Sequence, residues 1–418
     1  MDRHQPGGSH GRSRTTASPG RPWAALASPP DASPAGDRDG LRTGVWTTAG
    51  MLERHAAGID DLLTDTEAPV TARRGWWEAW LKSFPDAVPW VVARTDSSGN
   101  LRALAPLARR RKLGRMELVG LGDGVSDYLR LPARSTRDAV ELASSIAAHL
   151  LEVRGPWVLA LRQLPTDDPV AHALVTRLPH AALRGGGSAP RTRIDSRDDS
   201  HYLSRNYRKA ARNRFSRLER AGHEPRIEIL RDPVEVQGKL DEIIRICRAR
   251  EREMSGRSHL DDPRRERFLR TAAVSLAGEG SLEVALLLAD ERIIAYQLNL
   301  LDGRTYRTWN GHHDPTWADY SPGHVLDHRV IRRVLDDETI DEFDWMMGTE
   351  AYKLRASTHT VASCELVASS SRAAAVIAVG PRQAQARLVA MARESDRGAR
   401  VLERLRGIRG SLYEFRDR

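Results

Sequence analysis

The sequence Leu282-Glu-Val-Ala-Leu-Leu-Leu-Ala-Asp-Glu-Arg-Ile-Ile-Ala-Tyr-Gln-Leu-Asn-Leu-Leu-Asp-Gly-Arg-Thr-Tyr-Arg-Thr-Trp309 holds three strand-like runs. The turn pairs Asp290-Glu291 and Asp302-Gly303 separate them. An Asp-Gly pair between such runs is a strong hairpin signal, so this stretch predicts an antiparallel meander of three strands.

A loop, a helix and a strand are expected after the meander. The loop runs from Asn310 to Pro322, and the helix follows with Leu326, Val330 and Val334 at i, i+4 spacing. A last strand is expected from Ile340 to Met347. The order of elements is therefore meander, loop, helix and strand.

The helix begins at Ser321-Pro-Gly323. Proline suits a first helical turn, and glycine lets an outside group approach the backbone. The first N–H groups of a helix lack partners and lie at the positive end of its dipole. This junction is either an ordinary helix start or an anion site that suits a phosphate.

This order of elements resembles the core of the GNAT acyltransferase superfamily. Three motifs are similar to its CelD/BioF-like branch, which is related to the Fem aminoacyltransferases: Tyr320-Ser-Pro-Gly-His-Val-Leu326, Phe343-Asp-Trp-Met-Met-Gly348 and Tyr352-Lys353. The resemblance covers roughly residues 76–368. It implies that the loop and helix N-terminus hold the pyrophosphate of coenzyme A, with acetyl-CoA or another acyl-CoA as co-substrate.

Transfer of an acyl group from a thioester to an amine needs a base, an oxyanion donor and a proton for the thiolate. The expected cofactor-binding residues are Gly323, His324, Val325, Leu326 and Lys353. The expected catalytic residues are Tyr352, Glu350 and His312, with His313 and Asp314 as further candidate bases. Tyr352 would protonate the leaving thiolate. Exposed loop histidines are the alternative for His312 and His313.

An earlier part of the chain repeats the same order of strands, loop, helix and strand between Trp90 and Leu161. We therefore expect an α/β (α+β) fold of two tandem GNAT-like units, each a mixed central sheet flanked by helices. The first copy lacks Pro-Gly at its helix start, so it is expected to bind the acceptor or to support the other copy. Asp127, Tyr128 and Trp309 are the expected substrate-binding residues.

The predicted organisation has five parts. They are a disordered tail (1–43), an N-terminal GNAT-like domain (44–184), a flexible linker (185–199), a C-terminal GNAT-like acyltransferase domain (200–370) and a helical tail (371–418). Gly, Pro and Ser mark the first tail, and Gly185-Gly-Gly187 marks the linker. A basic helix, His201 to Ala221, is read as a solvated face, with phosphate or acidic-acceptor contact as the alternatives.

Composition limits the class of protein. The chain has 418 residues and a formal net charge of +9, which fits an anionic ligand without deciding its kind. Its two cysteines, Cys247 and Cys364, predict a reducing compartment, hence a cytoplasmic protein. No ligand spacing suggests a metal, and no apolar run is long enough to span a bilayer.

The sequence thus predicts a GNAT-like N-acyltransferase that moves an acyl group, acetyl in the first instance, from acyl-CoA to an amine or hydroxyl. The acceptor would be an amino acid, a sugar or a cell-envelope precursor, and nucleic acid is not expected as a partner. Two alternatives remain open: a Fem-like aminoacyltransferase that uses aminoacyl-tRNA, and a GNAT-shaped scaffold without catalysis.

Overall fold

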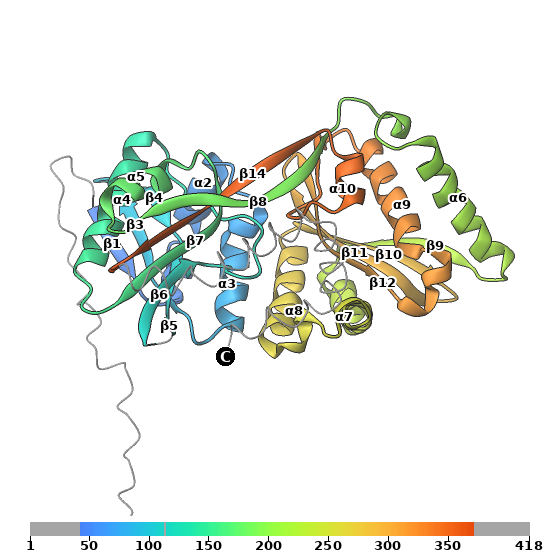
Figure 1. The fold of residues 1–418 in the computed structure, drawn as a ribbon, viewed down its shortest axis with the longest axis horizontal. Helices are drawn as coiled ribbons and strands as arrows, with labels where there is room; N and C mark the ends of the chain where they lie inside the picture. Colours follow the sequence, from blue (N-terminus) through green and yellow to red (C-terminus); the bar gives the residue numbers. More distant parts are fainter. Residues whose placement is uncertain (1–41, 113, 372–418) are drawn as a thin grey trace, which may run out of the picture.

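The structure is a computed structural model that describes residues 42–112 and 114–371 (Figure 1). The predicted disordered tail lies outside this range except for Arg42 and Thr43, which begin the first strand. The predicted helical tail, beyond residue 371, also lies outside it. No helix in the described ranges is long and apolar enough to cross a membrane.

The first half of the molecule pairs a layer of strands with helices. Its elements are β1 (Arg42–Trp46), α1 (Gly50–Arg54), α2 (Ala56–Asp65), α3 (Arg74–Ser83), β2 (Val88–Pro89), β3 (Val91–Thr95), β4 (Leu101–Ala105), β5 (Leu107–Lys112), β6 (Arg115–Gly120), α4 (Thr136–Leu151), β7 (Trp157–Pro165), α5 (Pro169–Arg177) and β8 (Ala182–Arg193).

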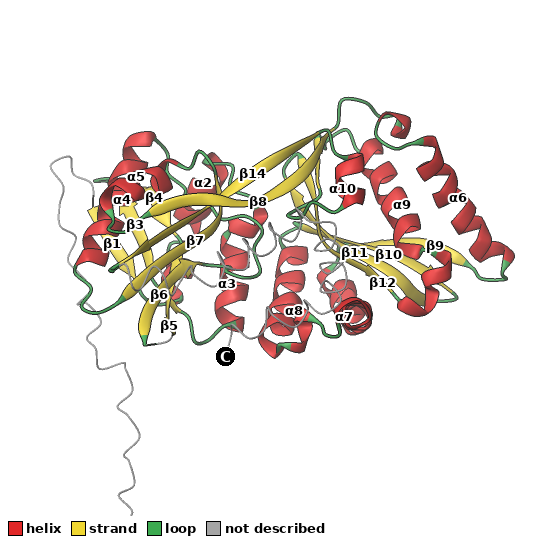
Figure 2. Cartoon of the chain, in the orientation of Figure 1, coloured by secondary structure: helices red, strands yellow, loops and turns green. Residues whose placement is uncertain are grey.

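The second half contains the predicted meander and helix. Its elements are α6 (Arg205–Arg220), β9 (Pro225–Leu230), α7 (Pro233–Ser255), α8 (Pro263–Gly278), β10 (Leu282–Ala289), β11 (Arg292–Asp302), β12 (Thr305–His313), α9 (Pro322–Asp336), β13 (Glu342–Asp344), α10 (Ala351–Ala356) and β14 (His359–Ser369). The strands β10 to β12 and the helix α9 confirm the sequence prediction. In Figure 2, α6, α9 and α10 cover one face of this half and α7 and α8 the other.

Each half joins two parallel strands through a helix. In the first half α4 connects β6 to β7, and in the second half α9 connects β12 to β13. The remaining neighbours in the large sheet pair antiparallel, so the sheet is mixed. This repeated strand–helix–strand unit confirms the predicted tandem GNAT-like fold.

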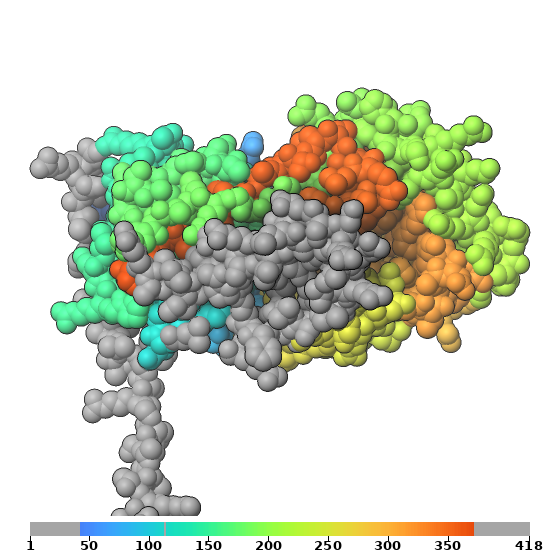
Figure 3. Space-filling model, in the orientation of Figure 1, coloured from blue at the N-terminus to red at the C-terminus, as the bar shows by residue number. Residues whose placement is uncertain are grey.

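A continuous sheet links the two halves. Among the described residues it has the strand order β2-β5-β6-β7-β14-β8-β13-β12-β11-β10-β9, beside a smaller sheet β1-β3-β4. The last strand, β14, pairs with β7 of the first half and with β8. In Figure 3 the orange-red surface of this final segment lies across the junction. Residues 359–369 therefore complete the sheet of the first half, although the sequence assigned them to the second.

The predicted flexible linker is wrong for residues 185–193, because they belong to the strand β8. The glycine run looked like a chain break, yet it serves close backbone packing. A Cβ at Gly186 would lie 3.1 Å from the backbone of Ser363, and one at Gly187 would lie 3.1 Å from Met347 Sδ. Glycine therefore allows β8 to run against β14 and the segment after β13.

The aromatic helix α3 packs the two halves together. Trp76, Trp77 and Trp80 are completely buried in a cluster that also contains α7, α8, β10 and β11 residues. Trp76 meets Phe268 of α8 edge-on at 5.0 Å between ring centroids, and Trp309 of β12 at 5.1 Å. This contact fixes the distance between the halves at the place where the cavity described below lies.

Candidate active site

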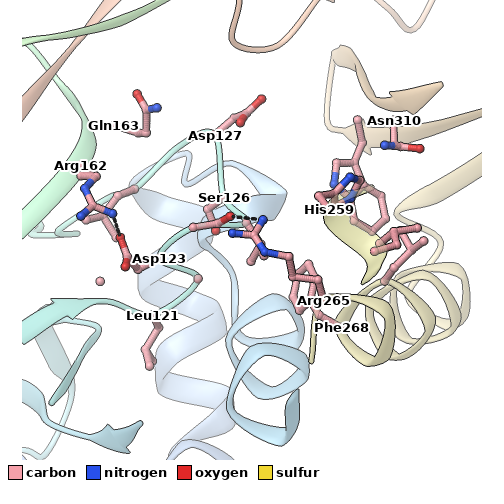
Figure 4. Close-up of a pocket in the computed structure, with 18 residues that line it drawn as sticks. Leu121, Asp123, Ser126, Asp127, Arg162, Gln163, His259, Arg265, Phe268 and Asn310 are labelled. Carbon is pink, nitrogen blue, oxygen red and sulfur yellow. Dashed lines mark hydrogen bonds and ion pairs between the residues drawn. The ribbon is translucent and has the colours of Figure 1, made fainter. Parts of the chain in front are cut away.

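A cavity of about 350 Å³ lies between the two halves (Figure 4). One wall comes from the loop after β6 and from β7, and the other from β12, α8 and the short helix His259–Asp261. Its lining residues are Gly120, Leu121, Gly122, Asp123, Gly124, Val125, Ser126, Asp127, Leu129, Arg162, Gln163, His259, Leu260, Arg265, Phe268, Leu269, Trp309 and Asn310.

A β-bulge places an aromatic side chain in this cavity. Asn310 pairs with Leu298 and Thr308 with Asn299, so Trp309 has no residue opposite it in the ladder. The bulge turns Trp309 onto Trp76 and Phe268, at 5.1 and 6.4 Å between ring centroids. The cavity thereby gains one apolar, aromatic wall.

The opposite wall is polar. Asp123 accepts hydrogen bonds from Arg162 at 2.7 Å and from Arg110 at 3.1 Å. Asp127 accepts a hydrogen bond from the backbone N–H of Met347 at 3.1 Å, and burial raises its pKa. A cavity with carboxylates and guanidinium groups facing an aromatic wall suits a small polar acceptor.

Two of the three predicted substrate residues, Asp127 and Trp309, line this cavity together. Tyr128 does not line it. Its hydroxyl donates to the Asp344 carboxylate at 2.8 to 2.9 Å, inside the interface between the halves. Tyr128 thus has a structural contact in this arrangement.

The parallel strands β12 and β13 separate beside the cavity. They pair only through Thr305–Arg307 and Glu342–Asp344. After that, β12 follows β11 to His313, while Trp345 and Gly348 donate to Pro190 and Ser188 of β8. Beyond Arg307, the free edge of β12 therefore faces a gap between strands within the described residues.

The start of α9 lies next to this gap and has the character of an anion site. Ser321 adopts the left-handed conformation, with φ of 48°, and no described side chain caps the helix. Arg217 of α6 donates to the Asp319 carbonyl at 3.1 Å, and Arg214 contacts the His324 imidazole. The His324 and Val325 amides donate to the Ser321 carbonyl, so two guanidinium groups stand beside the remaining amide of the first turn, that of Gly323.

The predicted cofactor-binding residues differ in which of their atoms are accessible at the start of α9. Gly323 is faced by the His313 ring, and a Cβ on Gly323 would lie 3.4 Å from His313 Nδ1. The side chains of Val325 and Leu326 are buried in the core under α9, so only their backbone faces the helix start. The loop predicted from Asn310 is shorter than expected, since His312 and His313 still belong to β12.

The structure does not gather the predicted catalytic residues at one point. His312 lies against α7, with Nε2 3.6 Å from Glu251 Oε1, and does not line the cavity. Tyr352, on α10, packs edge-on against Trp345 at 6.2 Å and is about half exposed. Burial, followed by the charges of Asp327 and Glu350, raises the Tyr352 pKa.

Lys353 is linked to the cavity through the backbone of Met347, and Glu350 is linked to it through Lys353. Lys353 Nζ donates to the Met347 carbonyl at 2.9 Å and lies 3.2 Å from Glu350. The N–H of that same Met347 holds Asp127. The backbone of Met347 thus connects Lys353 of α10 to Asp127 in the cavity wall.

Sequence reasoning missed His259 and Glu251. The ring of His259 lines the cavity, and its Nδ1 lies 2.7 Å from Glu251 Oε1. Glu251 belongs to the end of α7 and His259 to the next short helix, and no spacing rule links such positions. Only the turn between the two helices brings them together.

A group of potential metal ligands lies behind this pair. Ligand atoms of Cys247, Glu251 and His312 are within 4.8 Å of one another. The Glu251 oxygens already accept hydrogen bonds from Ser258 and His259. Burial first, then the Glu251 charge, raises the pKa of Cys247 to about 12, so this thiol stays protonated at neutral pH.

Comparison with known proteins supports this reading of the second half. Residues 205–354 match the family model described as an acetyltransferase (GNAT) domain. The solved structure of FemX shares 10% identity at a TM-score of 0.52, over 74% of this chain and 95% of that chain. No curated protein sequence matches.

Two further structures are similar at lower scores. A conserved protein of unknown function from Bacteroides thetaiotaomicron VPI-5482 shares 13% identity at a TM-score of 0.49, over 75% of this chain and 97% of that chain. The C-terminal domain of a putative lysylphosphatidylglycerol synthetase from Agrobacterium fabrum shares 12% identity at a TM-score of 0.48, over 78% and 95%. Residues 205–354 therefore match a GNAT acetyltransferase domain, and the chain shares its fold with FemX.

Proposed function

We propose that this protein transfers an acyl group from acyl-CoA to the amine of a small acceptor held in the cavity between its halves. The observation that carries the proposal is the separation of β12 from β13. It leaves a gap with the uncapped start of α9 beside it and the cavity next to Trp309 and Asn310. A donor in this gap would meet an acceptor at the cavity.

The phosphates of the donor would bind at the start of α9. The Gly323 amide at the positive end of the helix dipole, Arg214 and Arg217 provide positive charge there, and a pyrophosphate is their natural complement. The ring of His313 over Gly323 would then border the phosphates. Lys353 would fix the backbone of Met347, to which it donates a hydrogen bond. An acetyl group is the simplest acyl group for such a donor.

The chemistry would take place at the free edge of β12. A backbone N–H on that edge can stabilise the oxyanion of the tetrahedral intermediate, because it is fixed and partly shielded from water. Tyr352, with Glu350 next to it, is the proposed proton donor to the leaving thiolate. Its raised pKa keeps the hydroxyl protonated at neutral pH.

A second candidate donor is aminoacyl-tRNA, and one observation favours it. The outer face of α6 exposes four basic side chains over four helical turns: Arg205, Lys209, Arg212 and Arg220. Such a face suits a polyanion, and in Figure 1 α6 lies on the outside of α9. The third candidate, a scaffold without catalysis, makes no use of the uncapped helix start.

Gly323→Glu is expected to abolish coenzyme binding. A ligand at a hundred times its dissociation constant stabilises a protein by about 2.7 kcal/mol, which raises the melting temperature by roughly 5–10 °C. The parent should show this rise with acetyl-CoA. In the variant, a carboxylate would occupy the place of the phosphates, while the new Cβ meets His313 at an ordinary 3.4 Å. Thermal melting of both proteins, with and without acetyl-CoA, measures the effect.

Gly50→Glu is the matched control. Gly50 is the exposed first residue of α1, and a Cβ there would meet nothing within 4 Å. This variant should keep the full rise in melting temperature. If the melting temperature of the parent does not rise with acetyl-CoA, or rises equally in the Gly323 variant, the coenzyme does not bind at this site.

A further inference from the structure

We infer that His259 is the general base of the transfer reaction and that Glu251 positions it. This inference rests on the proposed function and adds a catalytic residue to it. It stands on three features of the structure: the contact of the His259 ring with Glu251, the place of that ring in the cavity wall, and the rigidity of the turn that carries it.

The contact between the two residues fixes the tautomer of the histidine. His259 Nδ1 lies 2.7 Å from Glu251 Oε1 and 2.8 Å from Oε2. A carboxylate only accepts hydrogen bonds, so Nδ1 carries the proton and donates it. The other ring nitrogen, Nε2, then has a lone pair, and no described residue donates to it. The arrangement is that of a histidine base oriented by a carboxylate.

Glu251 is held firmly as an anion. It also accepts from Ser258 Oγ at 2.6 Å and from the His259 N–H at 3.0 Å, and the His312 ring lies on its other side at 3.6 Å. Burial acts to raise its pKa, but the hydrogen bonds from His259 and His312 outweigh burial and keep that pKa below the ordinary value. The predicted catalytic residue His312 thus supports Glu251 from behind.

The turn that carries His259 is well anchored. Ser258 and Asp261 form a reciprocal capping box around the short helix His259–Asp261. Leu260 is buried in the core between α7 and α8, which leaves His259 directed to the cavity side. In Figure 4 His259 lies beside Asn310, across the cavity from Asp127 and Gln163. A base in this wall faces the position of a bound acceptor.

The proposed reaction begins with removal of a proton from the acceptor by His259. The acceptor enters as an ammonium ion, and His259 Nε2 takes one proton from it to become an imidazolium. The free amine nitrogen attacks the thioester carbonyl carbon, and a C–N bond forms. The tetrahedral intermediate then collapses, the C–S bond breaks and the second nitrogen proton leaves to solvent. The thiolate takes its proton from the proposed donor Tyr352, which regains a proton from solvent, and the imidazolium later returns its own proton to water.

Three variants test this assignment in the full-length protein. His259→Ala should lower kcat by about 100-fold or more, because general base catalysis contributes 10² to 10⁴. Added imidazole should restore part of that rate. Glu251→Gln keeps the shape of the side chain but offers an N–H to Nδ1, which would move the ring proton to Nε2 and block the base. It should lower kcat with little change in the KM of the acyl-CoA.

His172→Ala is the matched control, because His172 is exposed on α5 and its ring bonds, among the described residues, to the Thr166 carbonyl. It should retain the parent kcat. An active parent whose His259→Ala variant keeps its kcat would overturn this assignment alone. So would a loss that imidazole does not restore in a variant with unchanged melting temperature. A parent that releases no CoA with any amine would overturn the proposed function itself.

Discussion

Replacing Asp344 with alanine should lower the free energy of unfolding by about 3–5 kcal/mol. Asp344 is completely buried at the junction of the two halves. Its carboxylate accepts from Tyr128 at 2.8 Å, lies 3.4 Å from Arg191 Nε and contacts Arg307. Arg307 is itself buried, so the alanine would leave guanidinium groups in the interior without their central anion.

Chemical unfolding followed by tryptophan fluorescence measures this loss. The matched control is Asp341→Ala, which removes an exposed pair with Arg304 on the same segment of chain. An exposed pair contributes at most about 1 kcal/mol, so the control should differ little from the parent. Equal, small losses in both variants would show that the buried cluster does not hold the halves together.

Reversing the charge of Arg214 should weaken acyl-CoA binding by about 100-fold. A hydrogen bond to a charged group contributes about 1.5–3 kcal/mol, and a glutamate would add repulsion of the phosphates to the loss of that bond. Each 1.4 kcal/mol changes a dissociation constant tenfold. Arg214 contacts His324 in the first turn of α9, so its guanidinium stands where the phosphates are proposed to bind.

Arg212→Glu is the control for this effect. Arg212 lies two residues earlier on α6 with its side chain exposed on the outer face of the helix. The same charge change there should alter the dissociation constant of acyl-CoA only a few-fold, and less at higher salt. Titration calorimetry with both variants distinguishes a local contact from the general field of a basic helix. Equal weakening by both variants would contradict a specific site at Arg214.

The elements of the second half could be predicted because their signals are local. Asp302-Gly303 separates two strands, and the apolar spacing after Pro322 marks a helix. The connection between the halves could not be predicted in this way. It depends on β14 pairing with β7, about 200 residues earlier, and no local pattern encodes such a pairing. The glycines of β8 led to the wrong prediction of a linker, because both close packing and chain flexibility favour glycine.

The candidate site was predictable in part for the same reason. Asp127 and Trp309 were expected near an acceptor, and both line the cavity. His312 was expected as a catalytic base in the loop beside the donor site, but β12 continues to His313 and His312 lies against Glu251. His259 was missed, because its proposed role depends on a carboxylate from another helix and on a cavity that forms only between the two halves.

The central claim is that an acyl group passes from coenzyme A to an amine at the junction of the two halves. Incubation of the protein with acetyl-CoA, other acyl-CoA thioesters or aminoacyl-tRNA, each with a panel of amino acids, amino sugars and other small amines, tests it most directly. Free CoA thiol and acylated product are quantified together by mass spectrometry. The account predicts release of CoA that depends on one class of amine, with one acylated product per thiol. Absence of product with every acyl-CoA, or transfer only from aminoacyl-tRNA, would contradict it.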